Sequence, residues 1–206
     1  ASVNAKTLFA SYGGYTADIT VNGGSGLLQA PKIFDDSKAV LNTTINGASY
    51  VNGANTVYTS LGTALANVAA NGTVTVQGAT ALTASLSVTK SMTINGTGTV
   101  TLKPDLNAAI ININAEGVEL TLGGSVAYAA EVGTGICVNK PNTAVNFADT
   151  VSITTYRNAL RDSAGATGTV TVAVTGGSFT STGGNCFYFG DGASDVTVTI
   201  SGGTFA

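Results

Sequence analysis

The feature that most constrains this chain is a ten-residue segment that occurs twice near its C-terminal end. VTVAVTGGSF occupies residues 170–179, and VTVTISGGTF occupies residues 196–205, which is 26 residues later. Six of the ten positions are identical, and the other four are close exchanges. Self-similarity at a fixed spacing is typical of folds built by stacking one unit on the next. We therefore expect a repeat protein.

The 26-residue spacing extends towards the N-terminus from Val196 to Val170, Ala144, Val118 and Met92, each of which begins or adjoins an apolar strand pattern. Two further columns of apolar residues keep the same rhythm. One contains Phe205, Phe179 and Ile153, and the other contains Phe187/Phe189, Leu160, Ile136/Val138 and Ile111/Ile113. Three strands in each repeat, separated by glycine-rich corners, predict a roughly triangular solenoid of about five coils.

One helix is expected, over residues 60–70 (SLGTALANVAA), where Leu61, Leu65 and Val68 form an apolar stripe. Thr59 or Ser60 would cap its start, and Asn71-Gly72 would end it. A strand, TVTVQ, follows at once. This helix–strand pair resembles the entry of right-handed parallel β-helices of the pectin-lyase-like kind. The resemblance covers about residues 59–206 and implies an all-β, right-handed parallel β-helix with about 26-residue coils, whose first end is plugged by the helix.

Residues 1–58 show no clear repeat. Strand patterns occur at residues 17–21, 40–45 and 49–51, and Asn-Gly or Gly-Gly pairs mark the turns between them. We therefore divide the chain into an N-terminal strand and loop segment, residues 1–58, and a parallel β-helix, residues 59–206. The first segment would be a small cap on the β-helix, a set of extra coils, or an arm that docks elsewhere.

Composition excludes several functions. Only 9% of the residues are charged, the net charge is −3, and there is no basic run, so nucleic acid is not an expected partner. No apolar stretch approaches 18 residues, so no membrane span is expected. The chain has no histidine, which excludes Ser-His-Asp and Cys-His nucleophiles and most zinc sites. The opening ASVNA is compatible with a signal peptide that has been removed, and hence with secretion to the extracellular space or cell surface.

Cys137 and Cys186 are the two cysteines. They are separated by nearly two periods, so they should lie two layers apart, or about 9.6 Å at the usual strand spacing. That distance is too long for a disulfide. We predict two buried, unpaired thiols.

The β-helix enzymes that the fold resembles act on acidic polysaccharides, with carboxylates that hold calcium and a Lys or Arg base, or with a group of Asp residues. The residues that could play these parts are Arg157, Arg161, Asp162, Asp191 and Asp195. Asp162 and Asp191 should sit on neighbouring coils, where two carboxylates can bind calcium or act as an acid–base pair. We favour solvated corner charges instead, because charges are few and tryptophan is absent. No catalytic, cofactor or metal residue is assigned, and calcium is the one cofactor left open.

The second copy of the repeat is followed by a single residue, Ala206. A solenoid end without a cap presents unpaired strand edges and an open apolar core. We therefore expect a head-to-tail contact between subunits, in which an N-terminal strand pairs with the last coil of a neighbour. The expected interface residues are Lys6, Thr7, Leu8, Phe9, Asp18, Ile19, Thr20 and Val21 in the arm, and Val196, Val198, Ile200 and Phe205 in the last coil.

The predicted function is therefore that of an extracellular structural protein, not an enzyme, whose subunits polymerise with themselves into a fibre or surface layer. Two alternatives remain open. One is a β-helix that binds or cleaves polysaccharides. The other is a fragment of an adhesin or phage-tail-type protein, in which more chain follows residue 206.

Overall fold

A computed structural model describes residues 60–148 and 150–206, together with Tyr58 and the backbone of six short strands nearer the N-terminus. These strands are β1 (Phe9–Ala10), β2 (Thr16–Asn22), β3 (Phe34–Asp35), β4 (Val40–Asn46), β5 (Ser49–Asn52) and β6 (Thr56–Tyr58). The expected strands at 17–21, 40–45 and 49–51 correspond to β2, β4 and β5. β2 and β4 pair in parallel with Thr16 opposite Val40, a spacing that the sequence pattern did not reveal.

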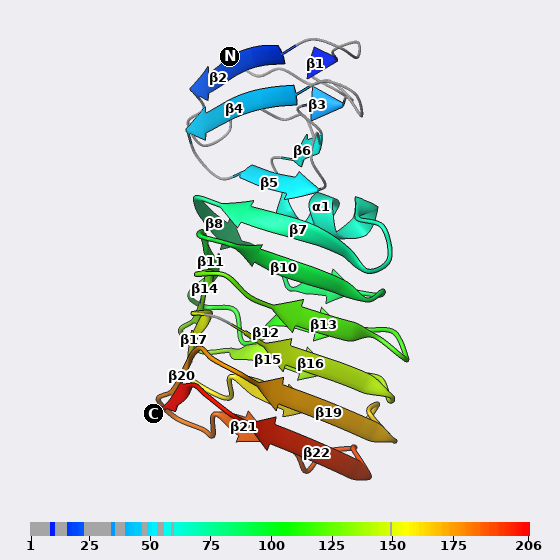
Figure 1. Ribbon diagram of the computed structural model, residues 1–206. Helices are drawn as coiled ribbons and strands as arrows, with labels where there is room; N and C mark the ends of the chain where they lie inside the picture. Colours follow the sequence, from blue (N-terminus) through cyan, green and yellow to red (C-terminus); the bar gives the residue numbers. More distant parts are fainter. Residues whose placement is uncertain are drawn as a thin grey trace.

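From residue 72 onward the chain winds through three parallel sheets, and each coil before the last contributes one strand to each sheet (Figure 1). The first sheet contains β7 (Gly72–Gln77), β10 (Met92–Gly96), β13 (Glu119–Leu122), β16 (Thr143–Phe147), β19 (Thr169–Val174) and β22 (Asp195–Ile200). The second contains β8 (Ala79–Leu82), β11 (Thr99–Leu102), β14 (Ala127–Ala130), β17 (Ser152–Thr155), β20 (Ser178–Ser181) and β23 (Thr204–Phe205). The third contains β9 (Leu86–Val88), β12 (Ala109–Ile113), β15 (Thr134–Val138), β18 (Leu160–Asp162) and β21 (Phe187–Tyr188). The predicted right-handed parallel β-helix with three strands per coil is confirmed.

The strand register shows that the coils differ in length. In the first sheet, Gly72 lies opposite Met92, Met92 opposite Leu120, and Glu119 opposite Ala144. These pairs give spacings of 20, 28 and 25 residues. Thr143 lies opposite Val170, and only the last pair, Val170 with Val196, has the 26-residue spacing of the sequence repeat. Uniform steps of 26 were therefore wrong for the earlier coils: the partner of Met92 is Leu120 and not Val118.

Register is maintained because the inward side chains are apolar, whereas a slip of one residue would turn them to the solvent. Ile153, Phe179 and Phe205 are stacked partners, and so are Ile136, Leu160 and Phe187, as the columns predicted. The last coils contain a cluster of phenylalanine rings. The ring centroid of Phe179 lies 4.9 Å from that of Phe147, 5.3 Å from that of Phe187 and 5.1 Å from that of Phe205.

The first end of the core is covered by the helix α1 (Leu61–Asn67). The hydroxyl of Ser60 accepts a hydrogen bond from the Thr63 N–H, so Ser60 is the N-cap. Leu61, Leu65 and Val68 are buried, as the stripe predicted. The expected end of the helix at Asn71-Gly72 was wrong, because α1 ends at Asn67 with Val68 as its C-cap. Asn71, with a left-handed φ of 60°, lies in the turn that precedes β7. β5 pairs antiparallel with β7, so the first sheet continues past residue 59 into β5 and β6.

Glycines at the corners allow the coils to approach closely. Gly96 has a φ of 121°, and a Cβ atom on it would lie 2.1 Å from the carbonyl oxygen of Val76. Gly124 occupies the same corner one coil later, with a φ of 67°, and its Cβ would lie 2.4 Å from the oxygen of Gly96. No side chain fits at either position, so these glycines set the stacking distance.

Candidate functional site

The end coil, which consists of β22 and β23, exposes the side chains that point inward elsewhere in the solenoid. Val198 lies opposite Val172 and Ile200 opposite Val174; both of the β19 residues are fully buried. Val198, Ile200 and Phe205, by contrast, are 40%, 54% and 41% exposed. β22 has a partner strand on one edge only among the described residues, where it ends the order of the first sheet (Figure 1).

The structure therefore places the four predicted C-terminal interface residues together on one end face: Val196 is half-buried, and the other three are exposed. The predicted interface residues of the N-terminal arm are only partly described by the structure. Lys6, Thr7 and Leu8 lie outside the described residues. Phe9 begins the edge strand β1, and Asp18, Ile19, Thr20 and Val21 lie within β2.

Asp162 is the most unusual charged residue in the solenoid. It ends β18, is fully buried, and accepts four hydrogen bonds from consecutive backbone N–H groups of the next coil. Its Oδ1 accepts from Gly190 at 3.1 Å and Asp191 at 3.2 Å, and its Oδ2 accepts from Gly192 and Ala193, both at 2.8 Å. One carboxylate thus organises the turn between β21 and β22. We call this arrangement the Asp162 clamp.

The electrostatics of the clamp favour the charged form of Asp162. Burial raises the pKa of the Asp162 carboxyl, but hydrogen bonds from four backbone N–H groups lower it by a larger amount. These donors belong to Ala193, Gly192, Gly190 and Asp191. The pKa of Asp162 therefore lies below its usual value of 3.8. The interpretation of Asp162 as a solvated corner charge was therefore wrong. The sequence could not reveal this clamp, because its four donors are backbone N–H groups, which any sequence carries.

Asp191 is positioned by the Asp162 clamp, because it lies in the turn whose N–H groups Asp162 binds. Its carboxylate forms a partly exposed ion pair with the guanidinium of Arg161. Arg161 also donates from Nε to the carbonyl oxygen of Asp162, at 2.9 Å. Asp162 and Asp191 are thus neighbours, as expected. Both oxygens of Asp162 already accept N–H groups, however, so the pair does not fit calcium or acid–base chemistry. Asp195 is exposed at the start of β22.

A groove of about 330 Å³ lies beside this ion pair, on the outside of the corner between the second and third sheets. It contains two tyrosines, two arginines and two asparagines, which come from two neighbouring coils. They are Tyr156, Arg157, Asn158, Arg161, Asn185 and Tyr188, and we call the feature the Arg–Tyr groove. A second hollow of about 230 Å³ shares Arg157 and Arg161 and continues along the third sheet past Asn112 and Cys137.

The two cysteines are free thiols, as predicted. They are only partly buried, however, so the prediction of burial was too strong. The Cys137 thiol donates to the side-chain oxygen of Asn139 at 3.2 Å, and the Cys186 thiol lies 3.4 Å from the carbonyl oxygen of Phe179. Burial raises the pKa of Cys137, and the nearby Arg161 offsets part of that rise.

Comparisons with known proteins add no identification. No family model matches the chain, and neither a curated protein nor a solved structure matches it. Within residues 60–148 and 150–206, no group of three or more His, Cys, Asp and Glu side chains is placed to hold a metal ion. The described helix is too short to cross a membrane. The end coil, the Asp162 clamp and the Arg–Tyr groove are thus the features from which function has to be argued.

Proposed function

We propose that this chain is an extracellular structural β-solenoid that extends head-to-tail, with a second copy stacked on the end coil. The observation that carries the proposal is the exposure of Val198, Ile200 and Phe205, whose counterparts one coil earlier are fully buried. Complete burial of such a side chain contributes about 1.5–3 kcal/mol. Covering three that are about half exposed would therefore contribute about 2–4 kcal/mol, before any backbone hydrogen bonds are added.

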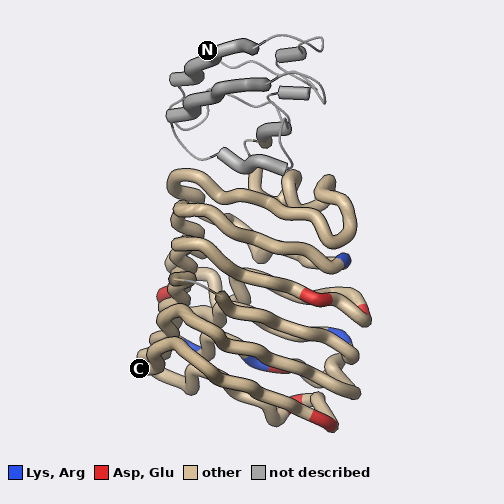
Figure 2. Tube along the Cα trace, in the orientation of Figure 1, with Lys and Arg blue, Asp and Glu red and all other residues tan. Residues whose placement is uncertain are grey.

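The backbone of β22 supports the same interpretation. A strand at the edge of a sheet presents a row of N–H and C=O groups that can pair with a strand from another chain. Charged residues, which commonly protect such edges, are sparse here: of the six residues in β22, only Asp195 is charged (Figure 2). Low charge also reduces the repulsion between copies. The end coil therefore has both the apolar surface and the strand edge that a stacked partner needs.

A second copy of the chain offers a suitable strand. β2 has seven residues, is paired on one edge by β4, and alternates apolar residues at Ala17, Ile19 and Val21. β22 has six residues and the same alternation. A contact between β22 of one copy and β2 of the next joins different surfaces, and such heterologous contacts generate open filaments unless their rotation closes a ring. This chemistry suits a fibre or a surface layer, and the proposal needs no catalytic step.

The test compares two aspartate substitutions on the same strand. Ile200→Asp places a charge on the end face, whereas Thr199→Asp places the same charge on the outward column beside Ala173. Sedimentation velocity over a hundredfold range of concentration, with negative-stain imaging, should show filaments for the natural chain and for Thr199→Asp, and single particles for Ile200→Asp. Monomers at every concentration would contradict the proposal and would favour a covering segment in a longer protein.

A further inference from the structure

The corner between the second and third sheets exposes apolar side chains, although it lies away from the end coil. Outside that coil, three large hydrophobic side chains of the described residues are highly exposed: Val132 at 38%, Tyr156 at 50% and Tyr188 at 38%. Val132 lies in the turn between β14 and β15, and Tyr156 lies in the equivalent turn of the next coil, between β17 and β18. Tyr188 ends β21, one coil further on. Aromatic residues are enriched in protein interfaces, so this corner is a candidate contact surface.

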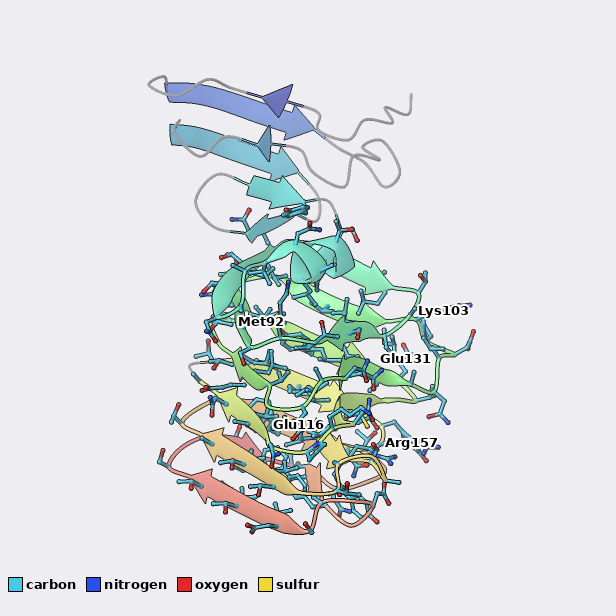
Figure 3. The ribbon with its side chains drawn as sticks, turned by 90° about the vertical axis from the view of Figure 1, so that its right-hand side faces the viewer. Met92, Lys103, Glu116, Glu131 and Arg157 are labelled. Carbon is cyan, nitrogen blue, oxygen red and sulfur yellow. The ribbon has the colours of Figure 1, made fainter. Side chains whose placement is uncertain are left out.

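Each of the first two turns also carries one exposed charge, and the two charges have opposite sign. Glu131 precedes Val132, and Arg157 follows Tyr156. Neither charged side chain has a hydrogen-bond or ion-pair partner within residues 60–148 and 150–206. Glu131 and Arg157 extend from the same side of the solenoid, on successive coils (Figure 3). The corner therefore presents one acidic turn and one basic turn, both available for contact with another molecule.

The basic turn borders the Arg–Tyr groove, which is wide enough to receive a short exposed turn. The groove has a volume of about 330 Å³, and it stays open because Gly183 and Gly184 of the next coil add no side chains to it. A Cβ atom on Gly183 would lie 2.6 Å from Cε2 of Tyr156, so the ring rests directly against this glycine. A ring that is supported in this way loses little conformational freedom when a partner binds.

We propose that the Arg–Tyr groove binds the acidic turn, residues 131–132, of a second copy of the chain, while the second copy's groove binds the same turn of the first. In this contact the Glu131 carboxylate of one copy meets the guanidinium of Arg157 in the other, whose fork of donors matches a carboxylate. Val132 of one copy packs on the exposed ring of Tyr156 in the other. Both copies use the same patch, as an isologous dimer requires.

The charges determine the direction in which the two copies run. If the coils of both copies followed the same direction, Glu131 would face Glu131 and Arg157 would face Arg157, and like charges in an interface are strongly unfavourable. A twofold axis across the stack, between these two coils, reverses the direction of the second copy, so that each charge faces its opposite. The lateral contact is therefore antiparallel. It differs from the head-to-tail contact at the end coil, which keeps all copies in one direction.

The lateral contact is small, because it involves a few side chains from each copy. Interfaces below about 1,200 Å² are typical of weak and transient complexes, so we expect a weak dimer of single copies. In a head-to-tail fibre the patch would recur once in every subunit, and many weak contacts would act together. The lateral contact would then join two antiparallel fibres side by side, a consequence that rests on the proposed head-to-tail assembly.

The experiment exchanges the two charges, separately and together, and measures dimerisation of the full chain by sedimentation velocity. The Ile200→Asp background removes the end contact, so a dimer is the largest species expected. Glu131→Arg and Arg157→Glu each bring like charges together and should weaken the dimer about a hundredfold. The variant with both exchanges should dimerise like the parent. An equimolar mixture of the two single variants should also form dimers, because every contact in the mixed dimer joins opposite charges.

Lys103→Glu is the matched control, since it also reverses an exposed cation on this side of the solenoid (Figure 3). In the antiparallel contact, Lys103 would face the uncharged turn at residues 182–185, so its reversal should leave the dimer unchanged. All the exchanged residues are exposed, and the variants should unfold at the same urea concentration as the parent.

Monomers at every concentration, a dimer that survives Arg157→Glu, or a mixture of the single variants that fails to pair would each overturn the lateral contact. The two proposals fail separately. A natural chain that forms no fibres contradicts the end contact, whereas the dimer is measured in the Ile200→Asp background without it. Fibres that persist in Arg157→Glu but no longer lie in pairs would support the lateral contact.

Discussion

Replacing Asp162 with asparagine should destabilise the C-terminal coils by about 2–4 kcal/mol. The side chain accepts four backbone N–H groups, two on each oxygen. Asparagine retains one oxygen but turns an NH2 group towards the other pair of donors, so two hydrogen bonds to a charged group are lost at about 1.5–3 kcal/mol each. The turn that carries the donors is partly exposed, and water can satisfy some of them, which reduces the sum.

The assay has a readout for each part of this reasoning. Urea unfolding followed by circular dichroism gives the change in stability, and hydrogen exchange should show lost protection of the amides of residues 190–193. Asp105→Asn is the matched control, because Asp105 is exposed and should change stability by less than about 0.5 kcal/mol. If Asp162→Asn matches this control in both measurements, the clamp does not contribute as argued.

Acid should reproduce the effect of the substitution. Burial raises the pKa of Asp162, and the four N–H groups lower it by more, so the folded chain binds the proton at a lower pH than the unfolded chain does. The clamp is then fully stabilising above about pH 5, and its contribution is lost as the pH falls through 3.8 and towards the lower pKa of the folded state. The difference in stability between the natural chain and Asp162→Asn should shrink across this range; a constant difference would refute the linkage.

Three further predictions concern the solenoid itself. Gly96→Ala should lower the free energy of unfolding by several kcal/mol, and Gly117→Ala should lower it by about 1–2 kcal/mol. Both glycines have a positive φ, but of the two only Gly96 faces a backbone oxygen within 3 Å. The urea midpoints of the two variants test this order. Phe179→Ala should cost about 3–5 kcal/mol, because the ring is fully buried among three others, and loss of a smaller amount would mean that the cluster collapses around the gap. Cys137 should react with iodoacetamide at pH 8 more slowly than free cysteine does, because burial raises its pKa and holds back the thiolate, and a rate equal to that of free cysteine would contradict this.

The fold could be predicted because its information is local and repeated. Each inward column contains apolar residues at corresponding points of successive coils, so a comparison of Phe179 with Phe205 aligns two layers directly. The lengths of the individual coils could not be predicted from the sequence. The corners accommodate insertions and deletions without disturbing the core, so the number of residues from Met92 to its partner Leu120 differs from the number from Val170 to Val196. Only the register of paired strands reveals these changes.

The sites were harder to predict, for two physical reasons. The Asp162 clamp depends on backbone donors, which leave no mark in the sequence. The Arg–Tyr groove joins residues about one coil apart, such as Arg161 and Tyr188, at a point where the local spacing is 27 and not 26. The exposed face of the end coil could be predicted, because Val198 and Ile200 continue an inward pattern that the sequence already showed.

The central claim is that a second copy covers the end coil, and hydrogen exchange of β22 tests it most directly. Amides of residues 195–200 that point away from β19 have no partner strand among the described residues, and they should exchange rapidly in dilute protein. At concentrations where the chain assembles, we expect their exchange to slow by at least tenfold, with no such change in Ile200→Asp. Protection that is the same at every concentration, in both proteins, would contradict the account.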